Sequence, residues 1–481
     1  MSDLARLDTD APVLRKPSFE YVTPCKPLPL LDRFLKGESP SVEMPSGMDP
    51  MVKELKKTLK ETGAEGSFES GLNPAQEIVR LMIGVGVGMR ASDIHITLHP
   101  VDAGSEHIGM LRYRVDGILH EASRFDPRLI PPVVEEWKRL ARCDVLERRL
   151  PQDGRIRIKA GQVGHAPEER ALDLRVCFVP ASMGESVTVR LLDASNVALE
   201  LKSIDYSEGD RERIERALEA PWGIILVTGP TGSGKTTVLY SCLNELAGSE
   251  KKIMSIEDPV EYHLPWVTQI PVRANIGFTF SRAMRSVLRS DPDAILIGEI
   301  RDRETLGMAQ KAALTGHLVL STLHTDEAAN TLKRMIEIGS DPFLVADATK
   351  LVISQRLVRK VCPSCGVEKK PSAKETDRAA EAARGGGMNL HGMEMKFRKA
   401  VGCGKCSSTG YRGRTVVSEM LEVTPEIGNI VRNGANVDKI REIAVGQGMT
   451  TMVADGIRRA AMGQTTLAEI ARVFGWKTTT G

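Results

Sequence analysis

The segment Gly229-Pro-Thr-Gly-Ser-Gly-Lys-Thr236 follows the apolar run Gly223–Thr228 and precedes a helix-forming stretch that begins at Lys235. It matches G-x-x-x-x-G-K-[ST] in full, between the strand and the helix that a phosphate-binding loop requires. Its glycines let backbone N–H groups turn toward phosphate oxygens, and the helix N-terminus adds partial positive charge. The segment therefore predicts a nucleotide-binding loop, in which Lys235 reaches the β- and γ-phosphates and Thr236 contacts Mg²⁺. The expected nucleotide contacts are Gly229, Pro230, Thr231, Gly232, Ser233, Gly234, Lys235, Thr236 and Thr237.

Polar side chains also end three strand-like runs further along the chain. These runs are IMSIEDPVEY (253–262) with Glu257 and Asp258, AILIGEI (294–300) with Glu299, and LVLSTLHT (318–325) with His324. In open α/β sheets the ligand site lies at the carboxyl ends of the strands, so we expect one cleft to contain all four side chains. Glu299 is the candidate that polarises water or organises the Mg²⁺ shell.

The order of the expected elements predicts more than one domain. From Ser207 to about Arg359, strands and helices alternate, which predicts a mostly parallel α/β sheet. Residues 71–205 form an α+β region with a helix starting at Asn73-Pro74 and a hairpin turn at Asp116-Gly117. Residues 1–70 are proline-rich with one expected short helix, Met51–Thr62; they are either a disordered tail or a segment that orders on a partner. Residues 424–481 are expected to form short helices.

Composition excludes several classes of protein. The 481 residues suggest two to four domains, and 65 Lys+Arg against 63 Asp+Glu leave a net charge of +2. This balance argues against a globally basic nucleic-acid coat and against an acidic disordered chain. Eight cysteines are too few for a secreted disulfide scaffold, and we find neither a signal-peptide h-region nor an apolar run near the ~20 residues of a spanning helix. We expect membrane contact only at the periphery or through a partner.

Four of the cysteines form two C-x-x-C pairs, Cys362/Cys365 and Cys403/Cys406. Each pair can supply two thiolates to a tetrahedral Zn²⁺ ion, whereas a single pair could also be a redox site. Two pairs without a thioredoxin-like βαβ pattern favour structural zinc. Residues 366–402 between the pairs exceed the usual spacing of about 15–20 residues. We attribute the excess partly to an insertion around Gly385-Gly386-Gly387, because surface loops lengthen at little cost.

In combination these motifs resemble the secretion ATPase superfamily that powers type II secretion and type IV pilus assembly. The stretches that carry the resemblance are GPTGSGKTT, SIEDPVEY, LRSDPDAILIGEIRD and TGHLVLSTLHT, together with RASDIHI, LRYRVDG and LPQDGR upstream. The resemblance covers about residues 72–475. It implies a PAS-like N-terminal domain (71–205) and a RecA-like P-loop ATPase domain (206–481) that includes a tetracysteine zinc subdomain (360–410). The family's frequent extra N-terminal domain does not fit into residues 1–70.

The resemblance also implies roles for the site residues. Glu257 and Asp258 would lie near Mg²⁺ and the attacking water, Glu299 would be the Walker B acid, and His324 would sense the nucleotide near the γ-phosphate. Arginines that reach the nucleotide phosphates as the domains close would be Arg175, Arg190, Arg285 and Arg289. The alternating run LDLRVCF by itself predicts that Arg175 points away from the face carrying Leu174 and Val176.

The function that the resemblance implies is a homohexameric ATPase with ATP bound between the two domains of each subunit. Its cofactors would be ATP, Mg²⁺ and Zn²⁺. Its partners would be a polytopic inner-membrane platform that adds or extracts pilin subunits and a further secretion or pilus protein at the cytoplasmic face. We expect a cytoplasmic protein held at the inner membrane by partners, and no nucleic-acid partner. Three alternatives stay open: a pilus-retraction motor, disfavoured by the paired cysteines; a DNA-translocating P-loop protein, disfavoured by the net charge; and a non-hydrolysing nucleotide-binding scaffold, disfavoured by the intact Glu299, Glu257 and His324.

Overall fold

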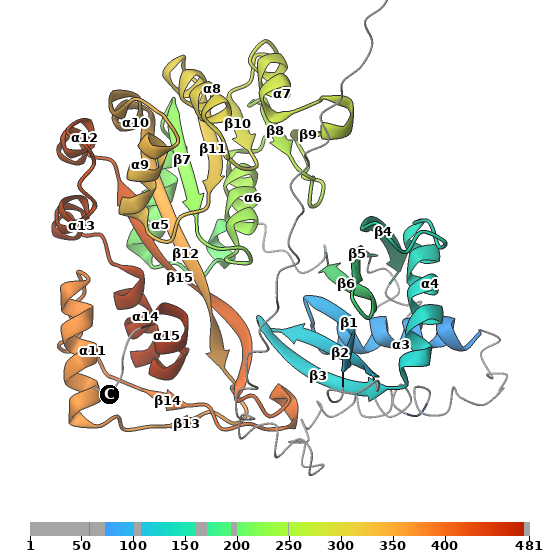
Figure 1. Ribbon diagram of the computed structural model, residues 1–481. Coiled ribbons are helices and arrows are strands. Elements are labelled where there is room, and N and C mark those ends of the chain that lie inside the picture. Colours follow the sequence, from blue (N-terminus) through green and yellow to red (C-terminus); the bar gives the residue numbers. More distant parts are fainter. Residues whose placement is uncertain are drawn as a thin grey trace, which may run out of the picture. The chain divides into compact units, whose positions relative to one another are not determined.

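The computed structural model describes Lys57 and residues 73–100, 107–159, 171–193, 200–248 and 250–475. Apart from Lys57, the expected arm over residues 1–70 and its helix Met51–Thr62 lie outside these residues. The described elements form two large sheets, one small two-stranded sheet and the helices that pack on them (Figure 1).

The first large sheet is antiparallel, with strand order β3-β2-β1-β6-β5-β4. Its elements are α3 (Pro74–Gly88), β1 (Asp93–Pro100), β2 (His107–Val115), β3 (Ile118–Phe125), α4 (Ile130–Ala141), β4 (Gln152–Lys159), β5 (Ala171–Ala181) and β6 (Gly184–Asp193). Helix α3 starts as expected, because Asn73 and Gln76 form a reciprocal capping box and Pro74 occupies the first turn. The β2–β3 hairpin turns at Asp116 (φ 47°) and Gly117 (φ 84°), as the Asp-Gly pair predicts.

Helices α3 and α4 cover one face of this sheet, and a single core joins them to it. The core contains Trp137 of α4, Met82 of α3 and the inward side chains Leu174, Val176 and Phe178 of β5. Between these, Asp173 and Arg175 alternate onto the opposite, partly exposed face. The orientation predicted for Arg175 is therefore confirmed.

The second large sheet has the order β15-β12-β7-β11-β10-β8-β9, and every pair except β12–β15 is parallel. Its strands are β7 (Gly223–Thr228), β8 (Ile253–Glu257), β9 (Val267–Pro271), β10 (Ala294–Ile297), β11 (Leu318–Leu323), β12 (Thr349–Val361) and β15 (Tyr411–Glu422). Helices between the strands are α5 (Glu208–Leu218), α6 (Lys235–Leu246), α7 (Phe280–Val287), α8 (Arg303–Leu314), α9 (Ala328–Glu337) and α10 (Pro342–Ala348). The predicted mostly parallel α/β sheet is thus present.

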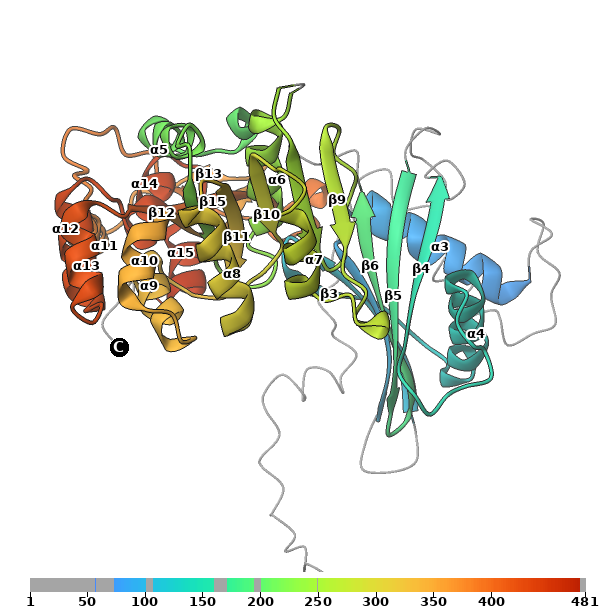
Figure 2. The same ribbon diagram turned by 90° about the horizontal axis from the view of Figure 1, so that it is seen from above.

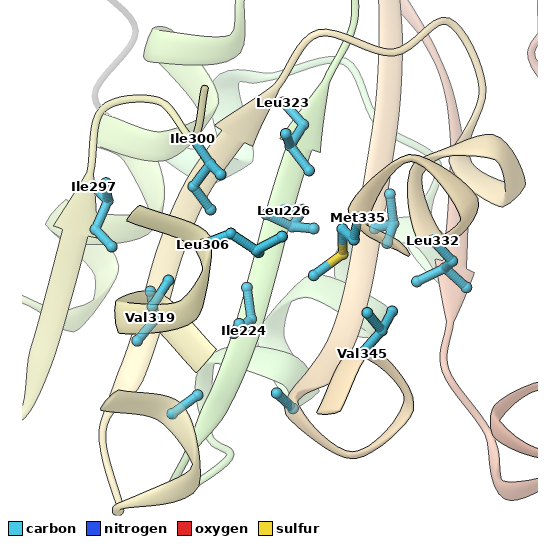
Figure 3. Packing of buried hydrophobic residues seen from close by; sticks show 14 of the residues in the cluster. Ile224, Leu226, Ile297, Ile300, Leu306, Val319, Leu323, Leu332, Met335 and Val345 are labelled. Carbon is cyan, nitrogen blue, oxygen red and sulfur yellow. The ribbon is translucent and has the colours of Figure 1, made fainter. Parts of the chain in front are cut away.

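Helices cover both faces of this sheet, which is why its central strands are buried along their whole length and mostly apolar. Along β7, Ile224 and Leu226 point to one face, where they pack against α8, α9 and α10 (Figure 3). Ile225 and Val227 point to the other face and pack in the core that α5 and α6 share. Figure 2 shows the sheet edge-on between α5 on one side and α8–α10 on the other.

The C-terminal part adds α12 (Pro425–Arg432), α13 (Val437–Gly446), α14 (Met452–Ala461) and α15 (Leu467–Phe474), in agreement with the predicted short helices. Helix α13 contacts α9, whereas α14 and α15 pack against each other and against β15 and β12. None of the helices in the described part of the chain has the length and apolar character needed to cross a membrane.

The stretch between the cysteine pairs differs from the expected surface insertion. It contains β13 (Val367–Glu368), β14 (Arg398–Lys399) and the helix α11 (Ala373–Gly385), whose Ala379 and Ala383 are buried against α14. A Cβ atom on Gly386 would lie 2.2 Å from Thr451 Oγ1 and 2.7 Å from Ala454 Cβ. The glycines at this point permit close packing on α14, so the long spacing reflects a packed helix and not a free loop.

Replacement of Gly386 by alanine should therefore reduce the free energy of unfolding by about 1–3 kcal/mol, the usual cost of overpacking. Gly385→Ala is the matched control, because among the described residues nothing lies within 4 Å of its Cβ position, and alanine should be neutral or stabilising by up to about 1 kcal/mol there. Urea unfolding measures both. Equal, negligible effects would mean that α11 does not pack on α14.

Candidate nucleotide-binding site

Four neighbouring strands bring the predicted polar residues to one edge of the second sheet. β7, β11, β10 and β8 are adjacent and parallel, so their carboxyl ends lie together. The glycine loop follows β7, His324 follows β11, Glu299 follows β10, and Glu257 ends β8 with Asp258 next to it. The arrangement expected from the motifs is therefore present in the folded chain.

The glycine loop between β7 and α6 has a conformation that requires its glycines. Gly229 (φ 137°) is buried, and a Cβ atom there would lie 2.4 Å from the carbonyl oxygen of Gln355. Gly234 (φ 91°) precedes the first residue of α6 in the left-handed region, so the loop turns directly into the helix N-terminus. Ser233 Oγ is buried without a hydrogen-bond partner among the described residues, which leaves a donor for an incoming oxygen.

Lys235 lies within this loop. Its Nζ donates to the carbonyl oxygens of Gly229 (2.8 Å) and Pro230 (3.1 Å). Burial lowers the pKa of Lys235, and the negative charge of nearby Glu299 opposes that shift. The charge of Glu299, which follows β10, thus acts on Lys235 at the start of α6. Thr231 and Thr236 are exposed, and Thr237 is half-buried.

Gln355 of β12 supports the loop from behind. Its Nε2 donates to the carbonyl of Ser233 at 2.9 Å, and its Oε1 accepts from the hydroxyl of Tyr206 at 2.6 Å. Tyr206 is buried among the residues that pack with α6. Neither residue was named from the sequence. The signal was available in principle, since Gln355 is a polar residue inside the apolar run KLVISQRLV, but nothing in that run indicates its partner.

Glu299 is the centre of the acidic part of the site. Its side chain is 15% exposed and forms an ion pair with Arg301. The other carboxylate oxygen lies 3.7 Å from His324 Nε2, and the imidazole is 54% exposed. The hydrogen bond to Glu299 raises the pKa of Arg301, and the charge of Asp258 contributes. Glu299, His324, Asp258 and the unpredicted Arg301 therefore form one polar group at the sheet edge.

Glu257 lies apart from this exposed group. Its side chain is buried and accepts hydrogen bonds from Tyr240, from Ser255 (2.5 Å) and from Gln269 (3.1 Å). Asp258, the next residue, is exposed. Glu257 thus fixes the end of β8 against α6 through Tyr240, whereas Asp258 faces outward. That both acids lie near Mg²⁺ and the attacking water stays a prediction.

The arginines of the antiparallel sheet form a row across neighbouring strands. Arg155, Arg175 and Arg190 are directly paired across β4, β5 and β6, so they share one face of the sheet. Arg155 pairs with Asp173, and Arg190 lies 3.3 Å from Asp93. Arg175 and Arg190 were predicted from the resemblance, whereas Arg155 was not, although the alternation in RIRIK places it on the same face.

Arg175 is the member of this row that contacts the second sheet's segments. Its guanidinium forms a 2.6 Å ion pair with Glu261, three residues after Asp258. Glu261 was not named from the sequence. The other two predicted arginines are not brought to the loop in this chain: Arg285 of α7 pairs with Glu304 of α8 at 2.8 Å, and Arg289 is exposed beyond the end of α7.

The two cysteine pairs come together as predicted. The sulfur atoms of Cys362, Cys365, Cys403 and Cys406 all lie within 4.8 Å of one another, with separations of 4.0 Å (Cys362–Cys403), 3.7 Å (Cys365–Cys406) and 3.8 Å (Cys403–Cys406). A tetrahedral zinc site with Zn–S bonds of about 2.3 Å has sulfur–sulfur edges of about 3.8 Å. Backbone N–H groups of Gly402 and Gly410 donate to Cys365 and Cys406. The donor set therefore fits a tetrahedral metal ion.

Comparison with known proteins finds similar sequences over most of the chain. A family model described as "Type II/IV secretion system protein" matches residues 69–472. The type IV pilus assembly ATPase PilB of Myxococcus xanthus (strain DK1622) is 38% identical over 440 residues, which cover 92% of this chain and 75% of that protein. The type II secretion system protein HxcR of Pseudomonas aeruginosa PAO1 is 41% identical over 400 residues, which cover 83% of this chain and 77% of HxcR.

Two solved structures share the fold. The ATPase DotB of Legionella pneumophila has a TM-score of 0.57 at 19% identity and covers 82% of this chain and 94% of DotB. The pilus retraction motor PilT with bound ADP has a TM-score of 0.52 at 24% identity and covers 82% of this chain and 96% of PilT. At this identity the likeness concerns the fold alone, which is a mixed α/β fold.

The contacts of Gln355 generate a prediction about nucleotide affinity. Gln355→Ala removes the bond to the Ser233 carbonyl and leaves the buried Tyr206 hydroxyl without its acceptor, so we expect nucleotide binding to weaken by about 5- to 30-fold, the effect of 1–2 kcal/mol. Tyr206→Phe removes only the outer bond and should weaken binding less. Titration with a fluorescent ADP derivative measures both, and unchanged affinity in Gln355→Ala would show that the loop needs no support from β12.

Proposed function

This chain belongs to the type II/IV secretion system protein family, and we propose that it is the ATP-hydrolysing motor that drives assembly of a type IV pilus or of a type II secretion pseudopilus. The observation that carries the proposal is the meeting of Glu299 and His324, 3.7 Å apart, with the glycine loop at one edge of the parallel sheet. A phosphate loop alone only binds, whereas an acid beside it can also activate water for attack on the γ-phosphate.

In this proposal the loop from Gly229 to Thr237 holds the phosphates of ATP. The unpartnered hydroxyl of Ser233 and the amino group of Lys235 provide donors, and the N-terminus of α6 provides partial positive charge. The hydroxyl of Thr236 would hold Mg²⁺, which neutralises phosphate charge when bound. The nucleotide and Mg²⁺ therefore fit the residues that surround the loop.

Glu299 is our candidate for the residue that orients and deprotonates the attacking water. Arg301 and His324 flank its carboxylate, and Asp258 adds a further exposed acid to the metal side. His324 is half-exposed and can donate a hydrogen bond toward the γ-phosphate, which suits the role of nucleotide sensor. Glu257 supports this group indirectly, since it holds the end of β8 in place through Tyr240 and Gln269.

We propose that the row Arg155, Arg175 and Arg190 supplies positive charge to the nucleotide when the two domains close. Arg175 already interacts with Glu261, close to Asp258 in the chain, and a guanidinium can exchange a carboxylate for a phosphate because both present paired oxygens. Arg285 pairs with Glu304, and among the described residues no hydrogen bond or ion pair joins Arg285 or Arg289 to this subunit's loop. They are candidates for a neighbouring subunit's nucleotide.

We further propose a homohexamer that acts on a polytopic inner-membrane platform from the cytoplasmic side. The support is the family and the relatives named as pilus assembly and type II secretion proteins. The domain division we propose is 71–205 and 206–481, and Tyr206, the first residue of the second domain, packs in the core of that domain. The antiparallel sheet with α3 and α4 on one face is compatible with a PAS-like first domain.

Assembly is favoured over retraction by both the relatives and the cysteines. Relatives named for assembly or secretion reach 38–41% identity, whereas the retraction motor PilT shares the fold at 24%.

We propose that Cys362, Cys365, Cys403 and Cys406 bind one structural Zn²⁺, because four thiolates without another donor suit a closed site. The zinc subdomain then comprises about residues 360–410. DNA translocation and a non-hydrolysing scaffold remain the alternatives that activity assays separate.

Two substitutions test the motor proposal. Lys235→Ala should abolish ATP binding and hydrolysis, whereas Glu299→Gln should retain ATP binding and lower kcat by about 10²-fold or more, since it removes the group that accepts a proton. Phosphate release by the purified chain measures hydrolysis. The same Glu299→Gln change on the chromosome should eliminate surface pili or type II secretion. Wild-type turnover near background, or normal pili in the variant, would contradict the proposal.

Zinc is tested independently of activity. Freshly purified, reduced protein should contain about one zinc ion per chain, and Cys403→Ser should lose it, because three thiolates bind far more weakly than four. Cys143→Ser is the matched control, as Cys143 is a free cysteine outside the cluster. Metal removal should unfold the 360–410 region while ADP binding is partly retained. Absence of zinc from the wild-type protein, measured by elemental analysis, would refute this assignment.

A further inference from the structure

The three residues that follow His324 and Thr325 each contact a residue further along the chain, on β12, α13 or β15. This short segment lies between β11 and α9, directly after His324. The three contacts are Asp326 with Arg356 (2.9 Å), Glu327 with Arg441 (2.5 Å), and the Ala328 N–H with Glu419 Oε1 (2.6 Å). Three consecutive contacts restrict the movement of this segment, so a displacement of the segment requires a displacement of Arg356, Arg441 or Glu419.

Glu419 connects this segment to a second helix. Its side chain is only 6% exposed, and its other oxygen accepts the Met452 N–H at 3.2 Å. One buried carboxylate thus receives the N-terminal amides of both α9 and α14, where the helix dipoles favour negative charge. Burial raises the pKa of Glu419, and the two backbone donors oppose the shift. A displacement of α14 along its axis would therefore pull on the residue that starts α9.

Arg441 makes a comparable connection from α13. It pairs with Glu327 on the segment and with Asp438 one turn earlier on its own helix. Arg356 adds a third connection, since its guanidinium also donates to the carbonyl of Val473 at the end of α15. Hydrogen bonds and ion pairs thus connect helices α13, α14 and α15 to the segment that follows His324. These contacts do more than stabilise α9, because each one involves a separate helix.

We propose that Arg441, Glu419 and Arg356 are positioning residues for His324, which couple the C-terminal helices α13–α15 to the γ-phosphate side of the nucleotide site. The inference rests on the proposed role of His324 as a nucleotide sensor. Because His324 lies two residues before Asp326, a shift of the segment moves the imidazole relative to Glu299, 3.7 Å away. The position of the C-terminal helices then changes the preference for ATP over ADP. The glycine loop, which holds the α- and β-phosphates, is not changed.

A variant of Arg441 tests the proposal with a closely matched control. Arg441 and Glu327 are 37% and 46% exposed at 2.5 Å, and Arg432 of α12 with Asp347 of α10 are 31% and 48% exposed, also at 2.5 Å. The two ion pairs therefore resemble each other in geometry and exposure. Only the first one involves the segment 326–328 that follows His324, which we call the sensor segment. Arg441→Met and Arg432→Met should lose similar, small amounts of stability.

The full-length protein and both variants are titrated with ADP and with a non-hydrolysable ATP analogue, and kcat and KM for ATP are measured alongside. Arg441→Met should reduce the preference for the analogue over ADP, and kcat, by about 2- to 30-fold, while ADP affinity stays within error. Arg441→Lys, which retains the charge, should restore part of the preference. Arg432→Met should change neither quantity.

Equal losses of ADP and analogue affinity in Arg441→Met, or the same loss of preference in Arg432→Met, would overturn the coupling and leave a purely structural ion pair. An unchanged preference in Arg441→Met would overturn it as well. The binding measurements do not depend on hydrolysis, so an inactive wild-type protein would refute the proposed motor function while the coupling is still decided by the two affinities.

Discussion

The parallel pairing of β7, β11, β10 and β8 is the constraint on which the rest of this structure depends. Parallel strands require helical crossovers, and these bury both faces of the sheet, so polar groups that face solvent are found mainly at the strand ends. The glycine loop, Glu299 and His324 come from three separate strand ends, yet they meet because those ends share one edge. An antiparallel order would have divided them between two edges.

Strand β12 continues beyond the end of β7 and so connects this edge of the sheet to other parts of the chain. Ser354 pairs with Thr228 at the end of β7, and β12 then continues for seven more residues beside the glycine loop before it reaches Cys362. Because side chains alternate along a strand, Gln355 faces the loop while Arg356 on the other face reaches the sensor segment. A single strand therefore contacts the phosphate loop, the segment after His324 and, through Cys362, the cysteine cluster.

The antiparallel sheet contributes charge in a different way. Its apolar face is covered by α3 and α4, which leaves the opposite face available for a row of arginines. Those arginines are paired with carboxylates such as Asp173 and Asp93. These ion pairs neutralise the charges of neighbouring arginines when no nucleotide is bound. The exposed arginines can exchange partners at modest cost in free energy, because surface ion pairs contribute little to stability.

The sequence by itself determined the local features of this protein. The glycine loop, the cap at Asn73, the Asp116-Gly117 hairpin, the strand ends with Glu299 and His324, and each of the two C-x-x-C pairs depend on residue type and short spacing, which neighbouring residues fix. Only the tertiary structure decided which residues distant in the chain form hydrogen bonds with one another. Tyr240 and Gln269 donate to Glu257, Gln355 donates to the glycine loop, and Glu419 accepts from the first residues of two helices. It likewise replaced the supposed insertion near Gly386 with a packed helix. The physical reason is that a hydrogen bond or a packing contact between residues far apart in the chain depends on sheet order and helix placement, which no short stretch of sequence contains.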